Sequence, residues 1–159
     1  MSTQIEWRNG GSPGNPNQLK EIEATLDVSF PEDFCRLILS HQGGVPHKNS
    51  FIVPAVSGAF GSCVGAFLWI EKENDDSIEI AIRNLEFLPS GFVPFADDGG
   101  GNYICFNYNK LNVDHSSTVV YWNRSASPKD QVIQLCSTFC EFLSMLSERG
   151  EIVSKLGAS

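Results

Sequence analysis

The sequence contains no long hydrophobic run. Its longest apolar segment, residues 64–70, is short and is interrupted by Gly65. The first twenty residues include Trp7 but no apolar stretch of signal-peptide length. A helix that crosses a bilayer needs about 20 consecutive apolar residues. We therefore expect neither a signal peptide nor a membrane span, and we expect the protein to be cytoplasmic.

Positive charge is also scarce. The chain has 11 Lys and Arg residues against 19 Asp and Glu residues, which gives a formal net charge of −8. Nucleic acids and anionic membrane surfaces attract positive potential, so neither is expected as a direct partner. A basic protein fits better, although an acidic balance is equally typical of an ordinary cytosolic protein. Net charge alone leaves both interpretations open.

The cysteines form no metal or disulfide pattern. Five is an odd number and no C-x-x-C pair occurs among them: Cys35, Cys63, Cys105, Cys136 and Cys140. Free, buried thiols are the expectation. The four-residue spacing of Cys136 and Cys140 places them on one helical face, where core packing is favoured because two thiols alone rarely hold a structural metal.

The three histidines also have no metal-binding residues at suitable spacing in the sequence. His41, His47 and His115 lie in or beside expected loops, with no Cys or Glu at metal-binding spacing. We expect exposed or capping side chains, with His41 in the last turn of a helix, where a cation is favourable. No catalytic histidine is predicted.

The length of 159 residues and a hydrophobic fraction of 42% fit a single domain. Such a chain buries roughly 70% of its unfolded surface. Residues 1–15 are rich in Gly and Pro, which predicts a flexible lead-in with at most a short strand over residues 5–8. The folded domain is expected over residues 16–150, followed by a short tail over residues 151–159.

Four helices are predicted from capping residues and apolar spacing. The first begins at Pro16 after an Asn15 cap, and the second follows Pro31 and ends at the Gly43-Gly44 pair. The third follows Ser77; its isoleucines also alternate as in a strand, but the cap favours a helix. The fourth is expected to be capped by Ser137 and to stop at Gly150.

Between these helices lie five short β-prone runs: residues 50–54, 64–70, 93–96, 103–108 and 118–122. Short strands separated by turn-rich segments favour an antiparallel sheet. Helices at both ends of a block of strands predict an α+β fold, with the N- and C-terminal helices packed on the sheet.

An acidic triple-glycine loop joins two of these runs. Glycines 99–101 allow positive φ angles, and Asp97, Asp98 and Asn102 can fix a turn by bonding to nearby backbone. No Lys or Arg accompanies the carboxylates, so a phosphate would be repelled, and the P-loop pattern is absent. No Ser, Cys or His stands where a nucleophile is needed.

The same loop is a weak candidate for a metal. Its three polar side chains offer oxygen ligands for a hard cation, but their spacing does not match a calcium loop and no bidentate Glu follows. We therefore expect no metal and no cofactor. A structural or recognition loop is favoured over a catalytic one.

Two tryptophans complete the candidate binding residues. Trp69 and Trp122 each end a β-prone run, where a large aromatic can either close the core or stand at the rim as an anchor for a partner. The sequence leaves both open. The candidate partner-binding set is therefore Asp97, Asp98, Asn102, Trp69 and Trp122, within either a generally solvated acidic surface or one acidic face.

Three blocks of sequence carry a family resemblance. The first runs from Ile22 through the FPEDF motif at residues 30–34 to Gly43-Gly44, the second covers residues 88–106, and the third joins residues 119–122 to the segment 137–146. Together they resemble the SUKH superfamily, the Smi/Knr-like group of bacterial immunity proteins and fungal cell-wall regulators. The chain departs from the family pattern at Gln42, Asn107, Asn123 and Arg124.

The resemblance implies a curved antiparallel sheet surrounded by helices, with no enzymatic activity. For bacterial members it implies binding and neutralisation of a cognate toxin, often a nuclease of a contact-dependent or polymorphic toxin system. A basic toxin is thus the expected partner. The five free cysteines and the acidic surface are compatible with either a monomer or a dimer. The alternatives are a regulatory scaffold or adaptor of the same fold and, as a third hypothesis, a metal-dependent enzyme built on the acidic loop.

Overall fold

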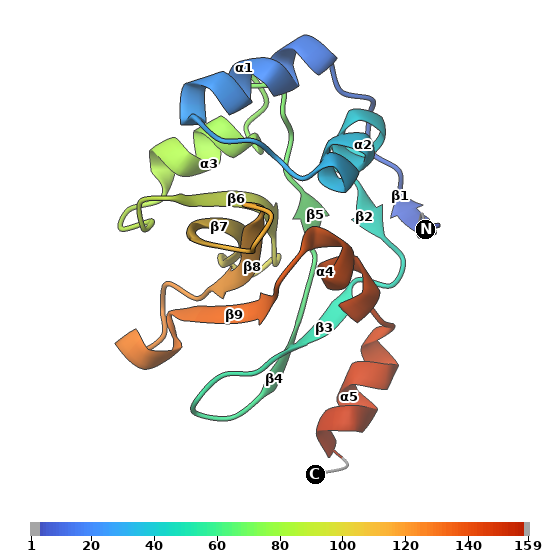
Figure 1. The fold of residues 1–159 in the computed structure, drawn as a ribbon. Coiled ribbons are helices and arrows are strands. Elements are labelled where there is room, and N and C mark those ends of the chain that lie inside the picture. The colour runs from blue at the N-terminus through green and yellow to red at the C-terminus, as the bar shows by residue number, and fades with distance from the viewer. Residues whose placement is uncertain (1–3, 158–159) are drawn as a thin grey trace.

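The computed structural model describes residues 4–157 (Figure 1). Residues 1–3 of the expected lead-in and residues 158–159 of the expected tail lie outside the described residues. The elements are β1 (Trp7–Asn9), α1 (Pro16–Leu26), α2 (Glu32–His41), β2 (Val45–Pro46), β3 (Ser50–Val53), β4 (Phe60–Cys63), β5 (Ala66–Phe67), α3 (Ile78–Asn84), β6 (Phe92–Asp97), β7 (Tyr103–Leu111), β8 (Ser117–Trp122), the 3₁₀ turn η1 (Pro128–Asp130), β9 (Val132–Cys136), α4 (Phe139–Met145) and α5 (Arg149–Gly157).

A five-stranded antiparallel sheet lies at the centre of the fold, in the order β5-β6-β7-β8-β9. The register shifts within the β6–β7, β7–β8 and β8–β9 pairs. Such bulges bend a strand and increase its twist, which accounts for the curved sheet in Figure 1. The predicted α+β fold with a curved antiparallel sheet is confirmed.

Two small antiparallel pairs flank the central sheet, β1 with β2 and β3 with β4. The single strand predicted over residues 64–70 is wrong. Cys63 still pairs with Ser50 of β3, whereas the Gly65 N–H donates to the carbonyl of Asp97 in β6. The chain therefore passes from one sheet to another at this point, and β4 ends before β5 begins.

Local capping sets the helix starts as expected in two cases. The Asn15 side chain accepts a 2.8 Å hydrogen bond from the Asn17 N–H at the start of α1. The Ser77 hydroxyl accepts from the Ile80 N–H at 3.1 Å, so residues 78–84 form a helix and not a strand. In each case a side-chain oxygen satisfies an N–H that has no partner within the helix.

The C-terminal part differs from the predictions. Thr138, not Ser137, caps α4 by accepting from the Glu141 N–H. Cys136 belongs to β9, a strand that was not predicted, so it shares no helical face with Cys140, which is exposed. Tertiary pairing overrides the helical spacing because β9 pairs with β8.

Gly150 does not end a helix, and the expected frayed tail is largely the helix α5. Ser147 exchanges two backbone hydrogen bonds with Ser50 of β3, and this bridge separates α4 from α5. Beyond it, Ile152 is buried, and α5 lies beside the β3–β4 hairpin (Figure 1). Burial of this apolar side chain explains why the segment is ordered.

Phenylalanine rings dominate the main core. Phe34 of α2 lies edge-on to Phe139 of α4 with ring centroids 5.3 Å apart, and Phe95 and Phe106 stack at 4.4 Å on adjacent strands. Successive strand residues face opposite sides of a sheet. The other side carries a smaller buried cluster of Leu85, Phe92, Cys105, Val120 and Trp122.

Candidate functional site

Two acidic loops approach each other beside the β5–β6 edge of the central sheet, where the charge of Asp76 acts on Asp97, and we call them together the acidic end. One is loop 97–102 between β6 and β7; the other is loop 70–77, which follows β5 and carries Glu71, Glu73, Asp75 and Asp76. Burial raises the pKa of the Asp97 carboxyl above its ordinary value, and the negative charges of Asp76 and Asp98 raise it further. Residues 21 positions apart in sequence thus share one electrostatic environment.

Loop 97–102 is held mainly by its own side chains. Oδ1 of Asp97 accepts from the Gly99 N–H at 2.9 Å, and Oδ1 of Asp98 accepts from Gly100 and Asn102 at 2.8 and 2.9 Å. Gly99 and Gly101 have φ angles of 76° and 98°, whereas Gly100 needs no positive φ. The prediction that side chains fix this turn is confirmed for Asp97 and Asp98 but not for Asn102, whose side chain bonds to residues outside the loop.

Tyr121 of β8 adds a contact that sequence reasoning missed. Its hydroxyl donates to Oδ2 of Asp98 at 2.7 Å and lies 3.4 Å from the Asn102 amide nitrogen. The other amide atom, Oδ1 of Asn102, accepts from the Arg124 N–H at 3.2 Å. No local spacing links Tyr121 to the loop, because the contact depends on the pairing of β7 with β8.

Trp69 lies at the base of the second acidic loop and is partly exposed. Its backbone N–H donates to the backbone carbonyl of Asp76 at 3.0 Å, and its own backbone carbonyl accepts from the Ile78 N–H. The indole ring covers Gly43, where an added Cβ would come within 2.5 Å of Nε1. The backbone of Trp69 is therefore fixed to loop 70–77, while its ring lies over Gly43.

Trp122 has the other role that the sequence left open. Only 3% of the side chain is exposed, and it packs in the smaller cluster with Cys105 and Val120. It closes the core and offers no surface to a partner. Of the five candidate residues, Asp97, Asp98 and Asn102 share one loop, Trp69 precedes the other acidic loop with its ring over Gly43, and Trp122 is buried.

The carboxylates of the acidic end are not neutralised within the protein. Across residues 4–157 the ion pairs within 4.0 Å are Arg36 with Glu32 and His47 with Glu148, and both lie elsewhere. The two acidic loops contain six carboxylates and one cation, Lys72, and the guanidinium of Arg124 lies near Gly101. The acidic end therefore presents uncompensated negative charge.

Among the described residues, no group of three or more His, Cys, Asp or Glu side chains is placed to hold a metal ion. Cys63 is the nearest nucleophile and donates to the carbonyl of Asp98 at 3.4 Å. Burial raises the pKa of its thiol, and Asp98 and Asp97 raise it further, so the reactive thiolate is disfavoured.

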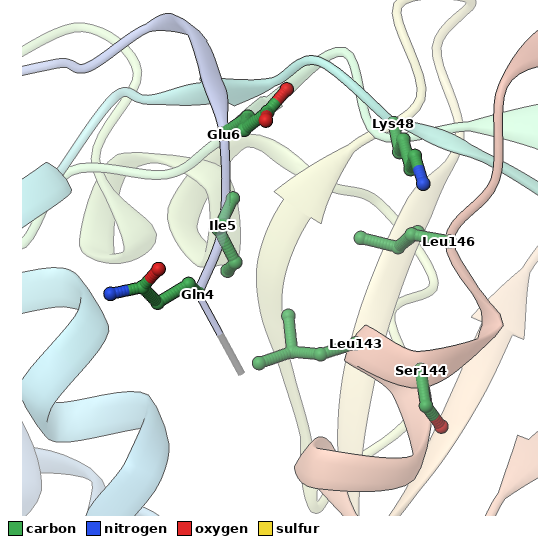
Figure 2. A pocket seen from close by; sticks show the side chains of 7 residues that line it. All are labelled: Gln4, Ile5, Glu6, Lys48, Leu143, Ser144 and Leu146. Carbon is green, nitrogen blue, oxygen red and sulfur yellow. The ribbon is translucent and has the colours of Figure 1, made fainter. Parts of the chain in front are cut away.

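A second concave region lies under the N-terminal strand. Two adjoining hollows, of about 380 and 550 Å³, share Ile5 and Leu143 in their linings. Figure 2 shows Leu143 and Leu146 facing Ile5 across the smaller hollow, with Glu6 and Lys48 at its rim. We call this region the N-terminal groove; it was not predicted from the sequence, because residues 1–15 were expected to form a lead-in.

His41 borders the larger hollow but is already engaged. Its ring stacks on Trp7 with centroids 4.2 Å apart, and Nδ1 lies 2.7 Å from the Gly10 carbonyl oxygen. It stands in the last turn of α2, as predicted. These contacts join β1 to α2, so the ring has a structural role.

A family model described as SMI1-KNR4 cell-wall, of the SUKH group, matches residues 16–143. No curated protein matches the sequence. No helix within residues 4–157 is long and apolar enough to cross a membrane. The matched segment runs from α1 into α4 and includes both loops of the acidic end. SUKH proteins include immunity proteins and are generally non-catalytic. Because most of its length fits the family model, the chain belongs to the SUKH superfamily, in its SMI1-KNR4 family.

Proposed function

We propose that this protein is a cytoplasmic, non-catalytic immunity protein that binds a cognate toxin through the acidic end and neutralises it. The observation that carries the proposal is the set of carboxylates in loop 70–77 that have no cationic partner in the described chain. Glu73, Asp75 and Asp76 are exposed, and their side chains accept no hydrogen bond among residues 4–157. They are free to meet a basic surface.

The physical basis is electrostatic steering followed by close packing. A negative surface accelerates encounter with a positive one, and a toxin that acts on nucleic acid has a positive cleft. A rigid aromatic side chain at the contact slows dissociation. Trp69 fits that role because it is partly exposed, directly precedes loop 70–77 and is held to that loop by backbone hydrogen bonds.

The test is co-expression with the toxin domain encoded next to this gene, with growth rescue and co-purification as readouts. The site variant Glu73→Gln/Asp75→Asn/Asp76→Asn removes three charges without disturbing an observed side-chain contact. The control Glu21→Gln/Asp27→Asn/Glu151→Gln removes three exposed charges elsewhere. We expect the site variant to associate about tenfold more slowly, with the control nearly unchanged.

The association rate of the unmodified protein should also fall steeply as salt is added, because screening weakens steering between exposed charges. Equal effects of the two variants, or a flat salt response, would remove the acidic end from the proposal. Absence of both growth rescue and co-purification would contradict the immunity role itself.

A second candidate is an adaptor of the same fold, and the N-terminal groove favours it. The hollow in Figure 2 combines an apolar wall with polar groups at the rim, as ligand sites often do. The variant Ile5→Trp would fill this hollow from the side that faces Leu143 and Leu146. An immunity protein should keep its toxin binding in this variant, whereas an adaptor should lose its ligand.

A further inference from the structure

A third hollow, of about 610 Å³, lies between the β3–β4 hairpin and α5, and we call it the α5 hollow. Two arginines, Arg8 of β1 and Arg149 at the first position of α5, belong to its lining, which contains no carboxylate. In a chain with net charge −8, a concave surface with cations alone is unusual. It differs in charge from the acidic end.

The positive charges of both guanidinium groups influence the same side chain of the hollow, the thiol of Cys63. Cys63 lines the hollow; burial and the charges of Asp98 and Asp97 raise the pKa of its thiol, and the positive charges of Arg149 and Arg8 oppose that rise. Neither arginine takes part in the ion pairs found within residues 4–157. Two unpaired cations that converge on one hollow form a site for an anion, because guanidinium binds carboxylate and phosphate groups through paired N–H donors.

The remaining wall is apolar. Arg149, Ile152, Val153 and Leu156 recur at i, i+3, i+4 and i+7, so one face of α5 carries a cation at its start and apolar side chains along its length. Gly61 of β4 permits the close approach of this helix, since an added Cβ would stand 3.1 Å from Cγ2 of Ile152. Val153 remains 59% exposed, which leaves apolar surface open to a ligand.

We propose that the α5 hollow binds an amphipathic organic anion, with its phosphate or carboxylate group between Arg8 and Arg149 and its apolar part along α5. The lining also offers the hydroxyl of Ser62 as a polar group. Both arginines and all of α5 lie outside the segment that matches the family model, residues 16–143. The cations and the apolar helix of the site thus come from the flanking parts of this chain, whereas the wall from Asn49 to Cys63 lies within the matched segment.

The experiment titrates the full-length protein with hexyl phosphate, hexanoate, inorganic phosphate and hexanol. Isothermal calorimetry gives affinities, and amide NMR shifts locate the site. We expect saturable binding of a hexyl anion, at least several-fold tighter than inorganic phosphate or hexanol because only the hexyl anion uses both parts of the hollow. Comparison of hexyl phosphate with hexanoate identifies the preferred head group. Shifts should concentrate at residues 61–63 and 149–156.

The variant Arg8→Gln/Arg149→Gln should weaken binding of the hexyl anion about tenfold or more. The control Arg83→Gln/Lys155→Gln removes two exposed cations that do not line the hollow, and it includes one from α5 itself. Its affinity should match that of the unmodified protein. Val153→Asp places a carboxylate on the exposed apolar wall and should also abolish binding while the fold is kept.

Three outcomes would overturn the proposal: no saturable binding of either hexyl anion, equal losses in the arginine variant and its control, or hexanol binding as tight as that of the hexyl anions. None of these readouts involves the toxin, so this site and the immunity role can fail separately.

Discussion

The Tyr121 hydroxyl donates a 2.7 Å hydrogen bond to the Asp98 carboxylate, and this contact ties the acidic loop to the central strand β8. Only 2% of the Tyr121 side chain is exposed, so the donor is fixed by the core while the acceptor faces the acidic end. Removal of the hydroxyl should therefore affect the stability of the fold and the order of the loop together.

We predict that Tyr121→Phe lowers the free energy of unfolding by about 1–2 kcal/mol, since it removes a hydrogen bond to a charged but partly solvated group. Urea unfolding gives the value. The matched control is Tyr108→Phe, which removes a hydroxyl bonded to the neutral Ser29 carbonyl and should cost about 1 kcal/mol or less. An equal or smaller loss at Tyr121 would contradict a special role for its contact with Asp98.

Gly65 lies between β4 and β5, and its backbone closely approaches loop 97–102. An added Cβ would lie 2.3 Å from Oδ1 of Asp97 and 2.7 Å from the Gly99 nitrogen. Gly65→Ala should therefore destabilise the protein by about 1–3 kcal/mol. Gly150→Ala is the control: nothing lies within 4 Å and the site is helical, so it should be neutral or raise stability by up to about 1 kcal/mol.

Asp97 predicts a pH dependence of stability. Because burial raises its pKa in the folded protein, the folded state binds the proton more tightly than the unfolded state does. The stability associated with this proton is present below the ordinary pKa of 3.8 and is lost as pH rises through the folded value. Asp97→Asn does not titrate, so the variant should gain stability relative to the unmodified protein between pH 3.5 and pH 7.

Thermal unfolding of both proteins across this pH range measures the difference. The Asn side chain can still accept the hydrogen bond from Gly99, so the comparison isolates the charge. A constant difference between the two proteins at all pH values would show that Asp97 titrates normally.

Thiol reactivity should single out Cys140, which is exposed on α4. Burial raises the pKa of Cys35 to about 11 and, with the charge of Glu141, that of Cys136 to about 12, while Cys105 is fully buried. We predict one rapidly alkylated thiol in the native protein at pH 8, and none in Cys140→Ser. Mass spectrometry after iodoacetamide treatment counts them; a second fast site would contradict the prediction.

The helix starts illustrate how far local sequence reaches. Asn15 and Ser77 bond to N–H groups two and three residues ahead, so their capping roles can be predicted without knowledge of the fold. At residues 137 and 138 two hydroxyl side chains stand side by side, and only the end of β9 decides that Thr138 is the cap. Local chemistry identifies a cap where one candidate exists and not where two compete.

The strand predictions failed where a segment has two possible partners. The run over residues 64–70 is apolar apart from Gly65, but only Ala66–Phe67 forms a strand, because β4 ends at Cys63 and the Gly65 N–H already bonds to β6. The Ser50–Ser147 bridge likewise divides the C-terminal segment into two helices. Such divisions depend on residues that lie far apart in sequence, and no local period encodes them.

The amino-acid sequence by itself determined the α+β class, the family and the self-bonded turn of loop 97–102, because these follow from short-range patterns and from motif residues. Only the tertiary structure decided that Trp122 closes the core while Trp69 borders a surface, that loop 70–77 approaches Asp97, and that Arg8 and Arg149 share one hollow. The physical reason is that burial and charge proximity depend on how strands pair and helices dock, and that arrangement minimises the free energy of the whole chain.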